Sequence, residues 1–199
     1  MGSDMATDLM RMTDAIEVAM ERARGMTSVT GLVGYGIAEL RDARGRLIEV
    51  QSFANLITDA GDLYYAGKMI TGISPANPAA PTAMNGMKLG TGVTAVAKNG
   101  AGGALVTYLT ASNVVFDATF PSTTNLGAGL GVNAVYKTTW AAGIATNAAI
   151  TEVVIVNDQA TNLTTTAANT ASRALFASAI NKGASDTLAV TWNHKMLGA

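Results

Sequence analysis

The sequence predicts a mainly β protein: an antiparallel, jelly-roll-like β-sandwich with an N-terminal α-helical arm and one short internal helix. Many runs of strand length are separated by turn residues, and the run 186–195 alternates apolar with polar residues. Helical spacing of apolar residues is confined to brief segments. No repeat of about 20–50 residues is visible, which argues against a solenoid or propeller. These observations together are typical of a sandwich fold.

Residues 1–27 are predicted to form the helical arm, and residues 28–199 the body. Within 4–24, five apolar residues recur with gaps of 4, 3, 4 and 4, so they share one face of a helix. They are Met5, Leu9, Met12, Ile16 and Met20. Because Met-rich faces adapt to irregular surfaces, this face is a candidate docking or self-association surface. Packing of the same helix on its own body is the alternative.

The body begins with a predicted β-hairpin. Strand-like runs at 28–40 and 46–54 flank a short charged turn that ends in Gly45. Thr58 is then expected to cap a short helix over 59–69, whose first turn carries two aspartates. Residues 72–86 hold three of the four prolines and predict an extended loop.

The rest of the body is predicted to consist of strands separated by loops. A polar loop rich in Thr and Asn is expected at 157–171. The predicted strands are 86–90, 104–110, 113–120, 131–141, 149–156, 172–178 and 186–195.

The composition is poor in charge. Charged residues make up 14% of the 199 positions, against about 25% in an ordinary domain. Residues 1–62 hold 16 of the 27 charged side chains, and Ala, Thr and Gly fill 82 positions. A surface so short of charge either has other polar cover or is buried in an assembly. The net charge of −1 argues against a nucleic-acid or anionic-lipid partner.

The chain has no cysteine, which excludes disulfides, thiolate metal sites and a cysteine nucleophile. The sequence contains no apolar run of about 20 residues, the length that a membrane-spanning helix needs. The N-terminus carries aspartates where a signal peptide would be basic. We therefore expect synthesis in the cytoplasm.

No pattern in the sequence predicts catalytic, cofactor-binding or metal-binding residues. His194, the single histidine, lies on the apolar side of the last predicted strand and is expected to be structural. The glycine clusters lack the spacing of phosphate-binding or dinucleotide-binding loops. The carboxylates of the neutral body have no partner nearby in the sequence: Asp117, Glu152, Asp158 and Asp186.

Two further groups are interpreted structurally. The arginines around the hairpin turn alternate with acids, which favours a solvated turn or an ionic contact to a neighbouring subunit over a nucleic-acid site. They are Arg41, Arg44 and Arg46. The central aromatic residues are interpreted as core before any glycan site: Tyr108, Phe116, Phe120, Tyr136 and Trp140.

Five ordered segments carry a resemblance to a known class of proteins. They are FANLITDAGD at 53–62, MKLGTG at 87–92, AVAK at 95–98, ITEVVIVND at 150–158 and KGASDTLAVTWNH at 182–194. Each motif is weak alone, but the ordered set, over roughly 50–199, resembles small virion structural proteins of tailed bacteriophages, especially those of actinobacterial hosts. The arm lies outside the resemblance.

The resemblance implies a β-rich, multimeric virion component without enzymatic activity or cofactor. The first expectation is a capsid decoration, or minor capsid, protein that forms a homotrimer and binds the major capsid protein outside the head shell. The second is a subunit of a tail fibre or baseplate that contacts other tail proteins. A third, from a different class, is a glycan-binding module or carbohydrate-active enzyme on a jelly-roll fold.

Overall fold

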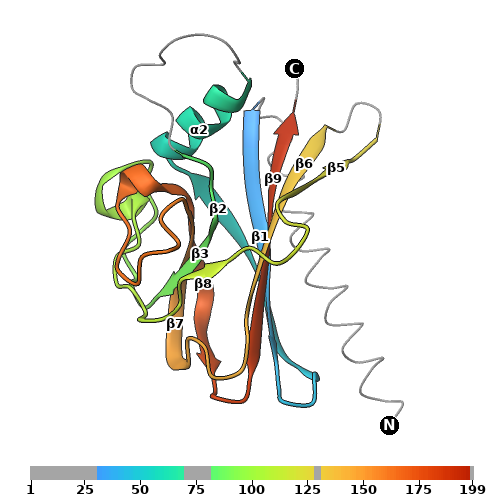
Figure 1. The fold of residues 1–199 in the computed structure, drawn as a ribbon, viewed down its shortest axis with the longest axis vertical. Coiled ribbons are helices and arrows are strands. Elements are labelled where there is room, and N and C mark those ends of the chain that lie inside the picture. Colours follow the sequence, from blue (N-terminus) through green and yellow to red (C-terminus); the bar gives the residue numbers. More distant parts are fainter. Residues whose placement is uncertain (1–30, 70–81, 128–130, 198–199) are drawn as a thin grey trace.

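In the computed structural model, the residues described are 31–69, 82–127 and 131–197 (Figure 1). The arm helix expected at 4–24, with its apolar face Met5, Leu9, Met12, Ile16 and Met20, lies outside the described residues. So do residues 72–81 of the expected proline-rich loop.

The described chain forms one nine-stranded antiparallel sheet and one α-helix. The strands follow one another across the sheet in the order β4-β3-β7-β8-β2-β1-β9-β6-β5. Two short 3₁₀ helices, η1 (Gly100–Gly103) and η2 (Ala167–Asn169), lie in the loops. The other elements are β1 (Gly31–Arg41), β2 (Leu47–Ile57), α2 (Asp59–Met69), β3 (Gly86–Gly90), β4 (Val114–Val115), β5 (Ser122–Asn125), β6 (Val132–Trp140), β7 (Asn147–Val156), β8 (Thr170–Lys182) and β9 (Thr187–Leu197).

The sheet curls at the junction between β2 and β8. β2 pairs with β1 along most of its length, but with β8 only through Leu56–Arg173 and Ile57–Ser172. The remaining strands can therefore fold over, so that the two halves of the sheet face each other. The segment after β4 closes the curl, because the backbone N–H of Asp117 donates to the Lys137 carbonyl of β6 at 2.8 Å.

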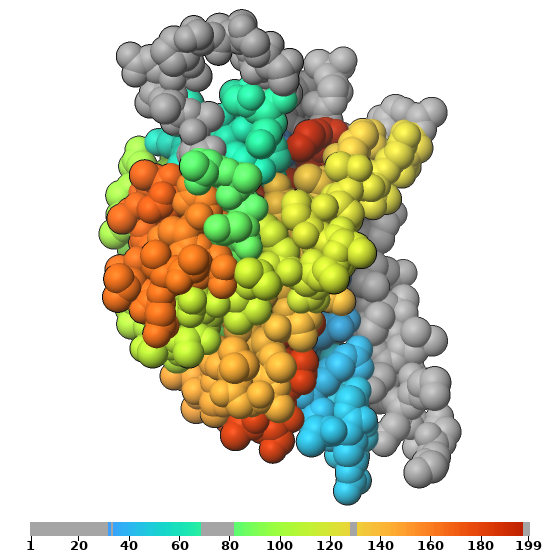
Figure 2. Space-filling model, in the orientation of Figure 1, coloured from blue at the N-terminus to red at the C-terminus, as the bar shows by residue number. Residues whose placement is uncertain are grey.

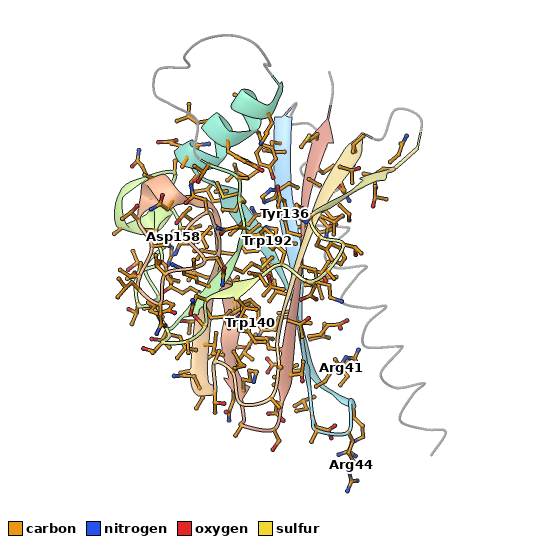
Figure 3. All side chains as sticks on the ribbon, in the orientation of Figure 1. Arg41, Arg44, Tyr136, Trp140, Asp158 and Trp192 are labelled. Carbon is orange, nitrogen blue, oxygen red and sulfur yellow. The ribbon has the colours of Figure 1, made fainter. Side chains whose placement is uncertain are left out.

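The core fills the space between the two halves. Phe53 of β2 packs edge-on against Trp192 of β9, with ring centroids 5.1 Å apart, and against Phe176 of β8 at 5.6 Å. Gly36 of β1 makes room for this cluster, since a Cβ there would lie 2.3 Å from the Phe53 ring. Farther from α2 in the core, Trp140 (labelled in Figure 3) donates from Nε1 to the Ser112 carbonyl at 2.7 Å.

The structure confirms the mainly antiparallel β architecture, the hairpin, and the internal helix at 59–69. Thr58 caps that helix as expected, accepting a hydrogen bond from the Gly61 N–H at 3.0 Å. A sandwich of two separate sheets is not confirmed, because hydrogen bonds join all nine described strands into one curled sheet.

Two predicted strands are wrong in extent. Residues 104–110 form a loop with a single bridge, Gly90–Tyr108, because the N–H groups of Val106 and Thr107 bind the Glu152 carboxylate instead of a strand. Of the strand expected at 113–120, only the two residues of β4 are in a strand. The short strand β5 was not predicted, since its sequence STTN has no apolar alternation.

Replacing the helix cap, Thr58→Ala, is expected to lower the free energy of unfolding by about 1–2 kcal/mol. The Thr58 hydroxyl is buried, bonds the N-terminus of α2, and also donates to the Thr170 carbonyl of β8. Urea unfolding followed by circular dichroism measures the change. Thr58→Ser retains the hydroxyl and is the control; an equal loss in both variants would contradict the capping role.

Candidate functional site

Two long irregular loops lie side by side and form what we call the loop face, residues 91–113 and 157–169 (Figures 1 and 2). The first loop connects β3 to β4, and the second connects β7 to β8. They are joined by side-chain hydrogen bonds: Thr164 Oγ1 donates to the Leu105 carbonyl at 2.9 Å, and the Tyr108 hydroxyl donates to Asn162 Oδ1 at 2.7 Å. Loops held by a rigid sheet are common places for binding sites.

A fully buried ion pair lies beneath this face. Glu152 of β7 and Arg173 of β8 are both 0% exposed, and Arg173 contacts Glu152 Oε2 from Nε at 3.0 Å and from Nη2 at 2.8 Å. Burying two charges is costly unless each also has further hydrogen-bond partners. Both residues satisfy that condition through the loop 91–113.

The ion pair ties this loop to the sheet at several points. The Glu152 carboxylate accepts hydrogen bonds from the backbone N–H groups of Gly92, Val106 and Thr107, at 2.9 to 3.2 Å. From Arg173, Nη1 donates to the carbonyls of Thr94 and Gly102, at 2.9 and 3.2 Å. These contacts replace the strand pairing that the loop lacks.

A second buried charge holds the loop 157–169. Lys88 of β3 is fully buried, and its Nζ lies 3.0 Å from Oδ1 of Asp158, which Figure 3 labels among the loops. The same ammonium donates to Thr161 Oγ1 at 3.0 Å and to the Leu163 carbonyl at 3.1 Å. Each loop is therefore fixed to the sheet by a charged side chain from a neighbouring strand.

The loop face is nearly free of charge and exposes several large apolar side chains among its Thr and Asn residues. Val93 and Leu163 are 76% and 68% exposed, and Val106 is also exposed. The two loops contain two charged residues, of which Asp158 pairs with Lys88 and Lys98 pairs with Asp62 of α2. Exposed apolar side chains on a rigid, uncharged surface are suited to binding through shape and apolar contact. This surface is the candidate functional site.

His194, expected to be structural, lies in a buried polar cluster away from the loop face. Its Nδ1 is hydrogen-bonded to the Tyr65 hydroxyl, which lies 2.9 Å from the Tyr136 hydroxyl. Its Nε2 lies 2.9 Å from Ser172 Oγ and 3.2 Å from Asn55 Nδ2.

Burial keeps this cluster uncharged. It lowers the pKa of His194 to about 3 and raises the pKa of Tyr136 to about 12. His194 is 0% exposed, so a substrate cannot reach the imidazole in this conformation. The cluster instead connects helix α2 to the strands β6, β8 and β9.

The arginines of the hairpin lie at the end of the molecule farthest from α2, where Figure 3 shows Arg44 pointing away from the body. Asp42 Oδ2 accepts from Arg46 Nε at 2.8 Å, and this bond lowers the pKa of Asp42. Arg41 Nη1 donates to the Gly45 carbonyl, and Gly45 has a φ of +77°. A shallow hollow of about 590 Å³ lies between this turn and the neighbouring loops of the sheet.

The other residues singled out in the sequence have structural contacts. Asp117 accepts hydrogen bonds from Thr139, and Asp186 from the Gly183 N–H. Tyr136 and Trp140 belong to the core, as predicted. Phe116 and Tyr108 pack against core clusters, and Phe120 is half-buried. In residues 31–69, 82–127 and 131–197, no three acidic or histidine side chains are placed to hold a metal ion.

Sequence reasoning treated Glu152 and Asp158 as unpaired and did not single out Lys88 or Arg173. Their partners lie 21 and 70 positions away along the chain. The available signal was a lone charge within an otherwise apolar strand, as in the stretches TASRALF at 170–176 and MKLG at 87–90, because such a charge is tolerated in a core only when paired.

No family model, curated protein or solved structure matches this chain. In the described part of the chain, no helix has both the length and the apolar character needed to cross a membrane.

Removing one partner of the buried ion pair, Arg173→Met, is expected to lower the free energy of unfolding by about 3–5 kcal/mol, because Glu152 becomes an unpaired buried charge. Urea unfolding measures this loss. Hydrogen exchange at the Gly92 and Thr107 amides should accelerate at the same time.

The control for this variant is Lys98→Met, which breaks the exposed pair with Asp62. That change is expected to alter the unfolding free energy by less than about 1 kcal/mol. Equal effects of the two substitutions would contradict the role assigned to the buried pair.

Stability is expected to fall on acidification because His194 binds its proton more readily in the unfolded chain. The unfolded pKa is about 6.5 and the folded pKa about 3, so the unfolded state gains the proton first as the pH drops below about 6.5. The loss approaches about 1.4 kcal/mol per pH unit in this window. Urea unfolding between about pH 7 and pH 5 measures the slope, which should flatten in His194→Gln. The same slope in both proteins would contradict this assignment.

Proposed function

We propose that this protein is a non-enzymatic structural component of a tailed-bacteriophage virion. The most specific form of the proposal is a capsid decoration protein that binds the outside of the head shell and stabilises it through multimeric contacts. The observation that carries it is the ordered set of motifs between 53 and 194, which resembles small virion structural proteins. Made in the host cytoplasm, the chain would then reside in the virion.

The positions of the motif residues support this interpretation. Thr58 caps α2, and Gly61 packs so closely that a Cβ would lie 2.1 Å from the Ala171 carbonyl. Lys88 and Glu152 are the buried charges beneath the loop face. The motifs therefore maintain a framework rather than a reactive centre, which suits a protein whose task is to fold and assemble.

The loop face supports an assembly role independently. Its exposed Val93 and Leu163 and its lack of free charge favour contact with another protein surface over contact with nucleic acid. The partners we propose are the major capsid protein and further copies of this chain, arranged as a homotrimer. A two-layer, jelly-roll-like packing of the curled sheet belongs to the same proposal.

A tail fibre or baseplate subunit is the second candidate function. The Thr- and Asn-rich loop 157–169 offers hydroxyl and amide groups of the kind that bind glycans, and this observation also favours the weaker alternative, a glycan-binding module. The aromatic residues that would stack on sugars are largely in the core, however, as Tyr136 and Trp140 are.

Immunogold labelling separates the head and tail locations. An antibody raised against this chain would be applied to phage particles propagated from the genome that encodes it. We expect label on the heads. Label confined to tails would replace the decoration role with the tail role, and particles without label would contradict a virion protein altogether. Clear signal on a glycan array would favour the binding module.

A charge placed on the loop face should weaken attachment to the shell. Leu163→Asp is expected to reduce affinity for head shells lacking the protein by tenfold or more, because burying an unpaired carboxylate costs above about 1.4 kcal/mol. Co-sedimentation with such shells measures the affinity. Ile144→Asp, at an exposed apolar position in the loop between β6 and β7, is the matched control. Equal binding by both variants would exclude the loop face from the contact.

A further inference from the structure

The outer face of the sheet half formed by β2, β1, β9 and β6 has no cover among the described elements. Strand register places Tyr35, Asn193 and Val135 in one row across β1, β9 and β6, and Ile37, Thr191 and Lys137 in the next. Their neighbours along each strand, such as Trp192 and Tyr136, point into the core. We call the six outward residues and the surface around them the outer face.

The described helix and loops lie on the other side of these strands. Helix α2 reaches β9 from the inner side, through Tyr65 and His194, and the loop face lies on that side as well (Figure 1). The outer face is half-buried and contains small or β-branched residues such as Ile37, Val135 and Thr191. A sheet face of this kind is suited to packing against a second layer.

Asn133, on the outward side of β6, has a polar side-chain atom without a hydrogen-bond partner. It alternates with the inward residue Ala134, so it points outward, yet it is 4% exposed. Its Nδ2 donates to the Tyr35 hydroxyl at 3.2 Å, and its Oδ1 is buried without a hydrogen-bond partner. A buried acceptor without a donor is rare in a finished surface.

We propose that residues 4–24 of the same chain form a helix that packs along the outer face, with Met5, Leu9, Met12, Ile16 and Met20 against it. A helix of 21 residues is about 31 Å long, and an 11-residue strand such as β1 is about 36 Å long. The apolar stripe of the helix and the length of the strand therefore match. A helix is also about 10 Å wide, enough to cover two strands.

The connection and the charges favour this occupant. The six residues 25–30 can span up to about 20 Å, which is sufficient for the chain to reverse before β1 begins at Gly31. Residues 4–24 contain five acids and three arginines, a net charge of −2, while Lys137 and Lys195 lie on the outward side of the sheet. Because a short linker attaches this helix to the body, its effective concentration at the outer face is about millimolar. The chain's own helix therefore occupies the face in preference to the helix of a second copy.

The packing has a consequence for assembly. While the helix covers the outer face, its apolar side is not available to another subunit, so the loop face is the free binding surface of the described body. The inference rests on the helical pattern and the sheet, not on the proposed virion function, and it can be tested with the isolated protein.

Cysteine cross-linking tests the contact, because the full chain has no cysteine of its own. The double variant Met12→Cys with Thr191→Cys would be treated with a short bis-maleimide at low protein concentration. We expect an internally cross-linked monomer, in yield several-fold above two controls. Asp14→Cys with Thr191→Cys moves the helix cysteine to the polar side, and Met12→Cys with Leu163→Cys moves the sheet cysteine to the loop face. Circular dichroism checks that each variant is folded.

Each outcome decides the proposal. A cross-linked monomer whose yield falls when Ile16→Asp is added supports packing on the outer face of the same chain. A covalent dimer would overturn it in favour of an arm exchanged with a second copy. A yield equal to that of the controls would show that the arm does not pack on this face. None of these results depends on where in a virion the protein resides.

Discussion

The ion pair between Glu152 and Arg173 is the contact on which the arrangement of the body depends. It joins β7 to β8 inside the core, and it holds the long loop after β3 through hydrogen bonds to Gly92, Thr94 and Val106. A loop rich in Gly, Ala and Thr has few large side chains with which to fix itself. The buried carboxylate supplies the acceptors that a neighbouring strand would otherwise provide, so the loop is ordered without becoming part of the sheet.

This constraint explains how a chain so poor in charge uses the charges it has. In the neutral body, Lys88, Glu152 and Arg173 are completely buried, while the loops above them expose Val93 and Leu163. In ordinary domains, charged side chains are almost never fully buried unless they are paired. These buried charges lie beneath a rigid surface with few charges, and such a surface is suited to an assembly partner more than to a soluble substrate.

Two faces of the molecule can therefore have different tasks. The loop face presents apolar side chains above buried charges, and the outer face of β1, β9 and β6 is the surface on which we propose that the N-terminal segment packs. In these two proposals, the arm completes the subunit and the loop face joins it to its neighbours. The buried cluster of His194, Tyr65 and Tyr136 lies between them and connects α2 to the sheet.

The sequence by itself determined the local structure of this protein. The hairpin, the capped helix at 59–69 and the alternating strand β9 all follow from turn residues, a capping hydroxyl and period-two patterning, which act over a few positions. The curl of the sheet and the loop at 104–110 were decided by tertiary structure. The curl follows from the two-residue pairing of β2 with β8, and the loop follows from hydrogen bonds between its amides and the Glu152 carboxylate. Contacts between residues far apart in the chain leave no periodic signal in it. For the same reason, Lys88 and Asp158 are recognisable as partners only in the folded protein.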